Sequence, residues 1–239
     1  MMQILGVMLL VAVVSFGLAE RGATTVTAFD LHAFVMVLGG SLAAILVSST
    51  TRTTARTLGC LREVLPGLGV LGPGTDTLES QRETLVALWR DGKRAQAVAL
   101  AEEGGDPVVA RMVSLVLERA PEEATRAAFT ELNHRTMERW QPAVSNWEVL
   151  AKLAPSFGMV GTITGMIQLF QNMGDDTSQL GASISLALVS TLYGVALGAG
   201  FAGPTGHYLR NLLDERLGAL ERCERSVYEL VARSSRAGA

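Results

Sequence analysis

Four stretches of the chain contain no Asp, Glu, Lys or Arg and are rich in apolar residues: 1–19, 33–51, 153–174 and 177–209. An α-helix needs about 20 mainly apolar residues to cross the roughly 30 Å hydrocarbon core of a bilayer. All four stretches reach or approach that length, so the pattern predicts an all-α membrane protein with four transmembrane helices. The first stretch could instead be a signal peptide, but it has no Lys or Arg at its start and no small-residue cleavage pattern before Glu20.

The charged residues predict how the spans are oriented. Arg52, Lys152 and Arg210 flank the apolar stretches on one side, whereas the short loops on the other side hold acids such as Asp30. Because loops rich in Lys and Arg stay in the cytoplasm, we expect both termini and the long charged segment to be cytoplasmic. The net charge of -3 and the 49% of hydrophobic residues say little about this orientation beyond what the distribution of charges indicates.

Helical signals also mark the polar part of the chain. Asp76 and Glu79 have the spacing of a capping box, and Asp106 followed by Pro107 is typical of a helix start. Spans three and four are expected to extend into cytoplasmic helices, since no strong break adjoins them. The expected organisation is an N-terminal hairpin of spans one and two (1–51), a cytoplasmic helical domain (52–152), channel-forming spans three and four (153–207) and a C-terminal amphipathic helix (208–239).

Spans three and four carry many small and polar residues, and small residues let two helix backbones approach closely in lipid. Neither span contains Asp, Glu, Lys or Arg, so a carboxylate that binds and releases an ion would come from a partner protein. Thr162 and Thr191 could offer oxygens to a cation, or each could bond its own helix carbonyl one turn back, the commoner case. Pro155 and Pro204 could be ordinary helix-end residues or kinks that gate motion.

Other chemistry has little support in the sequence. Cys60 and Cys223 both fall in expected cytoplasmic segments, where a disulfide would not persist, and His32, His134 and His207 lack metal-ligand spacing. No nucleophile–base set or phosphate-binding loop is visible, so we expect neither an enzyme nor a cofactor, and no nucleic acid partner.

Three segments resemble the MotA/PomA flagellar stator family within the MotA/TolQ/ExbB channel superfamily. They are FDLHAFVMVLGGSLAAILVS (29–48), APSFGMVGTITGMIQLFQNMGDD (154–176) and ALVSTLYGVALGAGFAGP (187–204). Two spans precede the charged segment, and Leu186 stands where TolQ and ExbB proteins usually carry Glu. These two features favour the stator branch of the superfamily.

The resemblance implies an A-type subunit of the bacterial inner membrane that forms a homopentameric ring around a dimer of single-span B subunits. The B subunits would supply the Asp that binds a proton or sodium ion, and ion flow would drive rotation against a cytoplasmic FliG-like rotor for flagellar motility. Thr162 and Thr191 match the family's pore-facing threonines, Pro155 and Pro204 match its paired prolines, and Asp30 matches a loop acid. The first threonine resembles sodium-type members, but proton-driven TolQ and ExbB proteins also have Thr there, so both cations stay open.

A rotor contact is also implied by the resemblance. Arg90, Lys93, Glu102 and Glu103 lie in the segment that resembles the rotor-contacting helix, and they could equally form a solvated helix face. The alternatives to a flagellar stator are a TolQ- or ExbB-type energy transducer, a non-flagellar motor for gliding or defence, and a membrane scaffold without an ion path.

Overall fold

The computed structural model describes residues 31–50, 53–55, 57, 59, 74–102, 106–172 and 177–236, and every regular element in them is helical. The expected first span, residues 1–19, lies outside this description, as do Asp30 and Glu103. Within the described residues, three helical stretches contain a segment long and apolar enough to cross a bilayer: Leu31–Ser48, Glu122–Gln171 and Leu180–Ser234. The all-α fold is therefore confirmed, and the second, third and fourth expected spans each coincide with an apolar helix.

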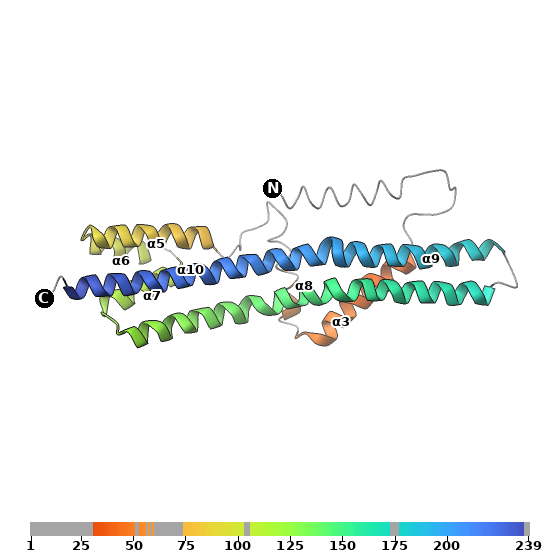
Figure 1. Cartoon of the computed structure of the whole chain (residues 1–239), viewed down its shortest axis with the longest axis horizontal. Helices are drawn as coiled ribbons and strands as arrows, with labels where there is room; N and C mark the ends of the chain where they lie inside the picture. Colours follow the sequence, from red (N-terminus) through yellow and green to blue (C-terminus); the bar gives the residue numbers. More distant parts are fainter. Residues whose placement is uncertain are drawn as a thin grey trace. The chain divides into compact units, whose positions relative to one another are not determined.

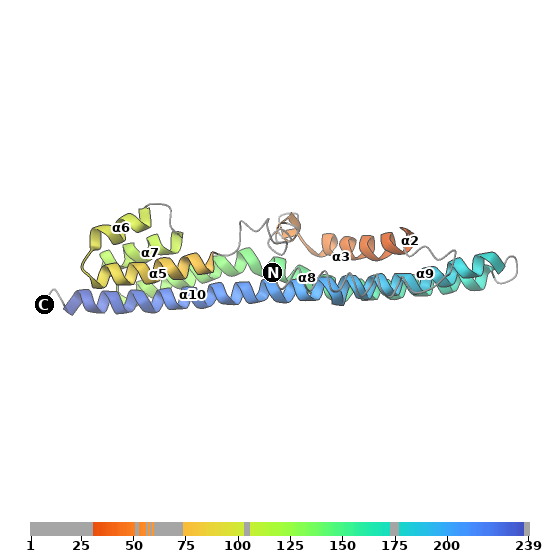
Figure 2. The same ribbon diagram turned by 90° about the horizontal axis from the view of Figure 1, so that it is seen from above.

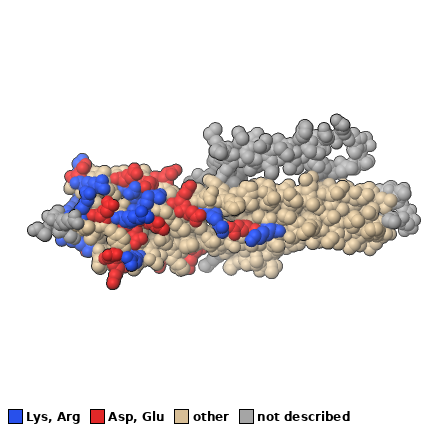
Figure 3. Space-filling model, viewed as in Figure 1, with Lys and Arg blue, Asp and Glu red and all other residues tan. Residues whose placement is uncertain are grey.

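The chain divides into two compact units. Unit 1 comprises residues 1–69 and 142–209, and unit 2 comprises residues 70–141 and 210–239. On the face shown in Figure 3, charged side chains gather over the helices of unit 2, and most of the remaining surface carries none. The charge-free stretches all belong to unit 1, which also holds residues 52–69 and 142–152 of the expected cytoplasmic domain.

Unit 1 contains the apolar helices. Span two consists of α2 (Leu31–Phe34), a π-helical turn η1 (Val35–Gly39) and α3 (Gly40–Ser48). Span three is the last part of α8 (Glu122–Asn172), and span four consists of α9 (Thr177–Val195), a second π-helical turn η2 (Ala196–Ala202) and the start of α10 (Gly203–Arg236). Helices α8 and α9 lie side by side in both views (Figure 1 and Figure 2).

The π-helical turn η2 lies directly before a proline. Pro204 is the second residue of α10, and its ring would press on the carbonyl four residues earlier in a regular α-helix. In η2 the amide of Gly203 donates instead to the carbonyl of Gly198, five residues back, which is the wider π-helical pattern. Span four continues past Pro204, as the sequence predicts, with this wider turn in front of the proline.

Helix α8 is continuous over 51 residues although Pro142 and Pro155 lie inside it. It begins directly after Pro121, and its first turn holds Glu122 and Glu123, whose negative charges suit the positive end of the helix dipole. The prediction that span three continues an upstream helix is confirmed. Each internal proline removes one backbone hydrogen bond without ending the helix.

Unit 2 is a small helical bundle around one apolar core. It contains α5 (Thr75–Arg90), α6 (Arg94–Glu102), α7 (Pro107–Leu117) and the unit's parts of α8 and α10. Helix α7 starts as predicted, because the Asp106 carboxylate accepts a hydrogen bond from the amide of Val108 at 3.0 Å. The part of α10 in this unit buries apolar residues, among them Leu220, Val227 and Leu230. The largest fully buried side chains of this core are Leu78, Leu85, Val109, Met112, Leu115, Val116, Phe129, Leu220 and Leu230.

The predicted capping box at Asp76 is wrong. Helix α5 begins two residues earlier than that box requires, with Gly74 as the N-cap in a left-handed conformation (φ 55°) and no side-chain cap. Glu79 instead directs its carboxylate to Arg82 at 2.6 Å and to Arg222 of α10 at 3.2 Å. Two arginines, one of them on another helix, therefore displace the local capping interaction.

Candidate functional site in the paired spans

The contact between α8 and α9 depends on glycines that face the neighbouring backbone. A Cβ atom added to Gly165 would lie 2.7 Å from the carbonyl oxygen of Ser183, and one added to Gly194 would lie 2.7 Å from that of Ala154. Ordinary Cβ contacts begin at 3.4 Å, so any larger residue would push the helices apart. The close packing predicted from the small residues is present, and it brings the side chains of one helix to the carbonyls of the other.

This packing places Thr162 of α8 against Thr191 of α9, and their hydroxyl groups are hydrogen-bonded to each other. The Thr162 hydroxyl also lies 3.2 Å from the carbonyl oxygen of Gly158 and 3.1 Å from that of Ala187. The Thr191 hydroxyl lies 3.4 Å from the same Ala187 oxygen. Each threonine thus reaches a carbonyl of its own helix, as the commoner interpretation predicts, and the two also meet across the interface.

Ser190 belongs to the same cluster, although the sequence analysis did not single it out. Its side chain is fully buried, and its hydroxyl donates to the carbonyl oxygen of Ala187 at 3.1 Å. The signal that could have found it is its position next to Thr191 and three residues after Ala187, on the side of α9 that meets α8. We call Thr162, Ser190 and Thr191 the hydroxyl cluster.

The hydroxyl cluster lies in uncharged surroundings. Thr162 and Thr191 are half-buried, and residues 153–172 and 177–206 contain no Asp, Glu, Lys, Arg or His. The described residues also hold no group of three His, Cys, Asp or Glu that could bind a metal ion. The spans therefore offer neutral hydroxyl groups, whose oxygens can contact a cation and whose O–H groups can donate a hydrogen bond to a carboxylate. The exposed apolar side chains on the two helices include Met159, Ile163, Met166, Leu188 and Val195.

The two prolines occupy different positions around η2. Pro155 of α8 packs against Gly198 of η2, where an added Cβ would lie 2.6 Å from the proline Cδ and 2.8 Å from the carbonyl oxygen of Ala151. Pro204 is exposed and follows the same turn. Pro155 thus packs against η2, and Pro204 lies just after the end of the same turn.

Leu186 faces span two. It is buried together with Ala33 and Val189, and the half-buried Tyr193 packs on this group. The Tyr193 ring also makes an edge-to-face contact with Phe34, with 6.1 Å between ring centroids. The position at which TolQ and ExbB proteins usually carry Glu is therefore filled here by an apolar contact between spans.

A second polar cluster in unit 1 joins α8 to the segment that follows span two. The buried Asn146 accepts a hydrogen bond from Ser49 at 2.8 Å and donates one to Thr57 at 2.9 Å. The Thr57 hydroxyl in turn donates to the carbonyl of Thr53 at 2.8 Å. Both ends of the Asn146 amide are therefore occupied, which fixes the orientation of its side chain.

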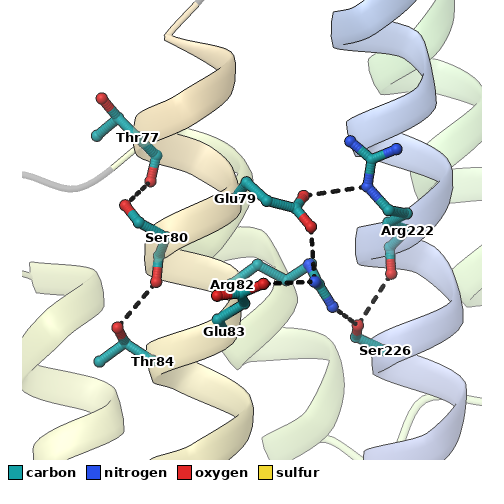
Figure 4. A network of polar contacts seen from close by, with 8 residues as sticks. All are labelled: Thr77, Glu79, Ser80, Arg82, Glu83, Thr84, Arg222 and Ser226. Carbon is teal, nitrogen blue, oxygen red and sulfur yellow. Dashed lines mark hydrogen bonds and ion pairs between the residues drawn. The ribbon is translucent and has the colours of Figure 1, made fainter.

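Ion pairs connect α5 and α7 to α10 inside unit 2. Figure 4 shows Arg82 between Glu79 and Ser226, with Arg222 on the other oxygen of Glu79. Burial alone would raise the pKa of Glu79, but the hydrogen bonds from Arg82 and Arg222 outweigh it and hold this pKa below its usual value. Asp106 forms a largely buried pair with Arg216.

The residues expected to contact a rotor are exposed where the structure describes them. Arg90, at the end of α5, forms an ion pair with Glu229 of α10 at 3.6 Å, and about half of its side chain is exposed. Lys93 and Glu102 are exposed at the two ends of α6. These three residues lie in unit 2, whereas Asp30 and Glu103 fall outside the described residues.

A known protein family and several known sequences match this chain. The profile of the MotA/TolQ/ExbB proton channel family matches residues 101–222. Motility protein A of Aquifex aeolicus is 28% identical over 202 residues, which cover 80% of this chain and 74% of that protein. Chemotaxis protein PomA of Vibrio alginolyticus is 25% identical over 173 residues, which cover 70% of this chain and 64% of that protein.

Two solved structures have the same fold. The structure of C. jejuni MotAB superposes with a TM-score of 0.79 at 19% identity and covers 96% of this chain and 89% of the matched chain. The flagellar MotAB stator complex from Bacillus subtilis gives a TM-score of 0.75 at 20% identity, with 95% of this chain and 88% of the matched chain covered.

Proposed function

The chain belongs to the MotA/TolQ/ExbB proton channel family, and we propose that it is an A-type stator subunit that converts an ion gradient into torque for flagellar motility. The observation that carries this proposal is the contact between Thr162 and Thr191, which offers neutral oxygens where two spans without charged residues meet. The similarity to MotA and PomA proteins and to MotAB complexes supports the same function.

The charge that the spans lack is supplied by a partner. A dimer of B-type, single-span subunits places an Asp beside Thr162 and Thr191, and five copies of the present chain surround that dimer. A carboxylate in apolar surroundings is costly when ionised, so it takes up a proton or pairs with a sodium ion, whose lost water is replaced by the threonine oxygens. Each charge that crosses 100 mV releases about 2.3 kcal/mol, which is the energy available for rotation.

Ion binding reaches the rest of the chain through Pro155 and Pro204. Because Pro155 packs against Gly198, a shift of α8 at this proline displaces η2, and Pro204 marks the point where the π-helical turn gives way to α10. A π-helical turn carries one more residue per hydrogen-bonded ring than an α-helix, and such turns inside α-helices occur frequently at functional sites. The two prolines thus gate the motion of span four.

The arrangement in the membrane follows the four charge-free stretches. Residues 1–51 form a hairpin of spans one and two, residues 52–152 a cytoplasmic helical domain, residues 153–207 the channel-forming spans and residues 208–239 a cytoplasmic helix. Both termini lie in the cytoplasm of a bacterium and the spans lie in its inner membrane, with Asp30 in an outer loop. The cytoplasmic domain contacts a FliG-like rotor through Arg90, Lys93, Glu102 and Glu103.

Replacement of the two threonines tests the proposal. We expect Thr162→Val and Thr191→Val, made together, to abolish swimming in cells that also produce the B subunit, because the ion loses its oxygen ligands. Thr164→Val is the matched control, since the Thr164 hydroxyl donates to the carbonyl of Val160 at 2.9 Å in its own helix. Full torque in the double variant, measured on tethered cells, would rule out the proposed ion path.

A sodium titration identifies the ion. Swimming speed is measured across sodium concentrations at fixed pH, with and without a protonophore. Speed that follows sodium and survives the protonophore assigns the threonines to a sodium site. Speed that ignores sodium and collapses with the protonophore assigns them to a proton path.

A further inference from the structure

Ser190 is a buried hydroxyl that the ion pathway described so far leaves without a function. It fills the space opposite Gly161, where an added Cβ would collide with both the Cβ and the hydroxyl oxygen of the serine. On the next turn of α8, a Cβ added to Gly158 would lie 3.0 Å from the backbone oxygen of Ser190. The serine side chain therefore packs against Gly161, and its backbone carbonyl packs against Gly158.

Two other hydroxyl groups compete with Ser190 for its hydrogen-bond acceptor, the carbonyl oxygen of Ala187. Thr162, Ser190 and Thr191 all lie within hydrogen-bond reach of the Ala187 oxygen, at 3.1, 3.1 and 3.4 Å. Ala187 and Thr191 both belong to the regular helix α9, so the amide of Thr191 occupies one of the two lone pairs of this carbonyl. One lone pair remains for three hydroxyl groups.

The competition determines where the threonine protons point. When Ser190 holds the remaining lone pair, Thr191 can donate to Thr162 and Thr162 to the carbonyl of Gly158. In that arrangement the Thr191 oxygen keeps both lone pairs free. When the serine hydroxyl is missing, Thr191 can donate to Ala187 and Thr162 to Thr191, so that the Thr191 oxygen loses one of its free lone pairs.

We propose that Ser190 is a positioning residue of the ion path, which occupies the Ala187 carbonyl and thereby keeps the oxygens of Thr162 and Thr191 available to the transported cation. This inference rests on the proposed stator function. Ser190 does not touch the cation, because its side chain is buried between the helices. Its effect passes through the orientation of the two threonine hydroxyls.

The test is a titration of swimming speed against the coupling cation, sodium or protons, in cells that produce Ser190→Ala with the B subunit. We expect the cation concentration at half-maximal speed to rise about three- to ten-fold, the effect of one lost hydrogen bond, while speed at saturating cation stays within about a third of the unsubstituted value. Ser41→Ala is the matched control. The Ser41 hydroxyl is equally buried and donates to the carbonyl of Val37 at 2.6 Å in span two, away from the hydroxyl cluster.

A lower maximal speed with an unchanged half-maximal concentration would overturn the inference, because it would make Ser190 a packing residue. If Ser190→Ala fails to accumulate in the membrane, Ser190→Cys provides the same readout, since a thiol fills a similar space and donates only weakly. The proposed function fails separately, when Thr162→Val with Thr191→Val leaves full torque. Loss of torque in that pair together with an unshifted Ser190→Ala titration refutes only the serine's role.

Discussion

Gly198→Ala tests the contact between Pro155 and η2 most directly. The added methyl group would lie 2.6 Å from the proline Cδ and 2.8 Å from the carbonyl oxygen of Ala151, whereas ordinary contacts begin at 3.4 Å. Both obstructing groups are rigid, so α8 and η2 must separate by most of an ångström. Overpacking of this kind costs about 1–3 kcal/mol, and each kcal/mol lowers the Tm of a chain of this size by about 2–4 °C. We therefore expect the Tm of the detergent-solubilised complex with the B subunit to fall by about 2–12 °C.

Two comparisons make this experiment specific. Gly181→Ala serves as the control, because a Cβ at this position of α9 meets no atom within 4 Å, and it should leave the Tm unchanged or raise it slightly. Pro155→Ala combined with Gly198→Ala removes the Cδ atom that the new methyl group meets, and this combination should recover part of the lost stability. If Gly198→Ala melts at the unsubstituted temperature and its cells swim at full speed, the close contact and the gating function assigned to it are both refuted.

Three further predictions concern unit 2. Asp106→Ala removes both the cap of α7 and the partner of Arg216, whose side chain is only 11% exposed. It should lower the free energy of unfolding by about 3–5 kcal/mol in denaturant titrations. Asp106→Asn keeps a capping oxygen and should cost less. Because the pKa of Glu79 in the folded protein lies below the ordinary 4.5, its ion pairs stabilise the fold above about pH 4.5 and lose this effect as the pH falls through the lowered value. A Tm series from about pH 7 to pH 3 should therefore decline less steeply for Glu79→Gln, and parallel curves would contradict the assignment. Burial raises the pKa of the Cys223 thiol to about 12, so a maleimide at pH 8 should label this residue only after unfolding, as read by peptide mass spectrometry.

Much of the fold could be predicted from local sequence signals. Three of the four charge-free stretches coincide with apolar helices of the described residues, and Asp106 with Pro107 located the start of α7, because both signals act within one or two helical turns. The capping box at Asp76 failed for the opposite reason. One partner of Glu79 is Arg222, which is 143 residues away along the chain, and no local pattern reports it.

The candidate site was predictable only in part. Thr162 and Thr191 were identified as hydroxyl groups in uncharged spans and matched through the family resemblance, but their direct contact depends on the register of α8 against α9, which the glycines set in three dimensions. Ser190 was missed because a small polar residue in a span is adequately explained by packing alone. The π-helical turn η2 was missed as well, since Pro204 predicts a disturbance of the helix without specifying its form.

The hydrogen bonds of Asn146 with Ser49 and Thr57 cannot form until all three residues have been synthesised. They therefore set a minimum time for the folding of each newly made chain. Ser49 and Asn146 are 97 residues apart, so the segment after span two is synthesised long before the amide that holds it. At a translation rate of about 5–20 residues per second, this segment waits roughly 5–20 seconds without its hydrogen-bond partner. During this interval it is open to proteases and chaperones. Substitution of Asn146 would leave this segment without its hydrogen-bond partner permanently. The cellular half-life of the protein should therefore shorten before any defect in torque is detected.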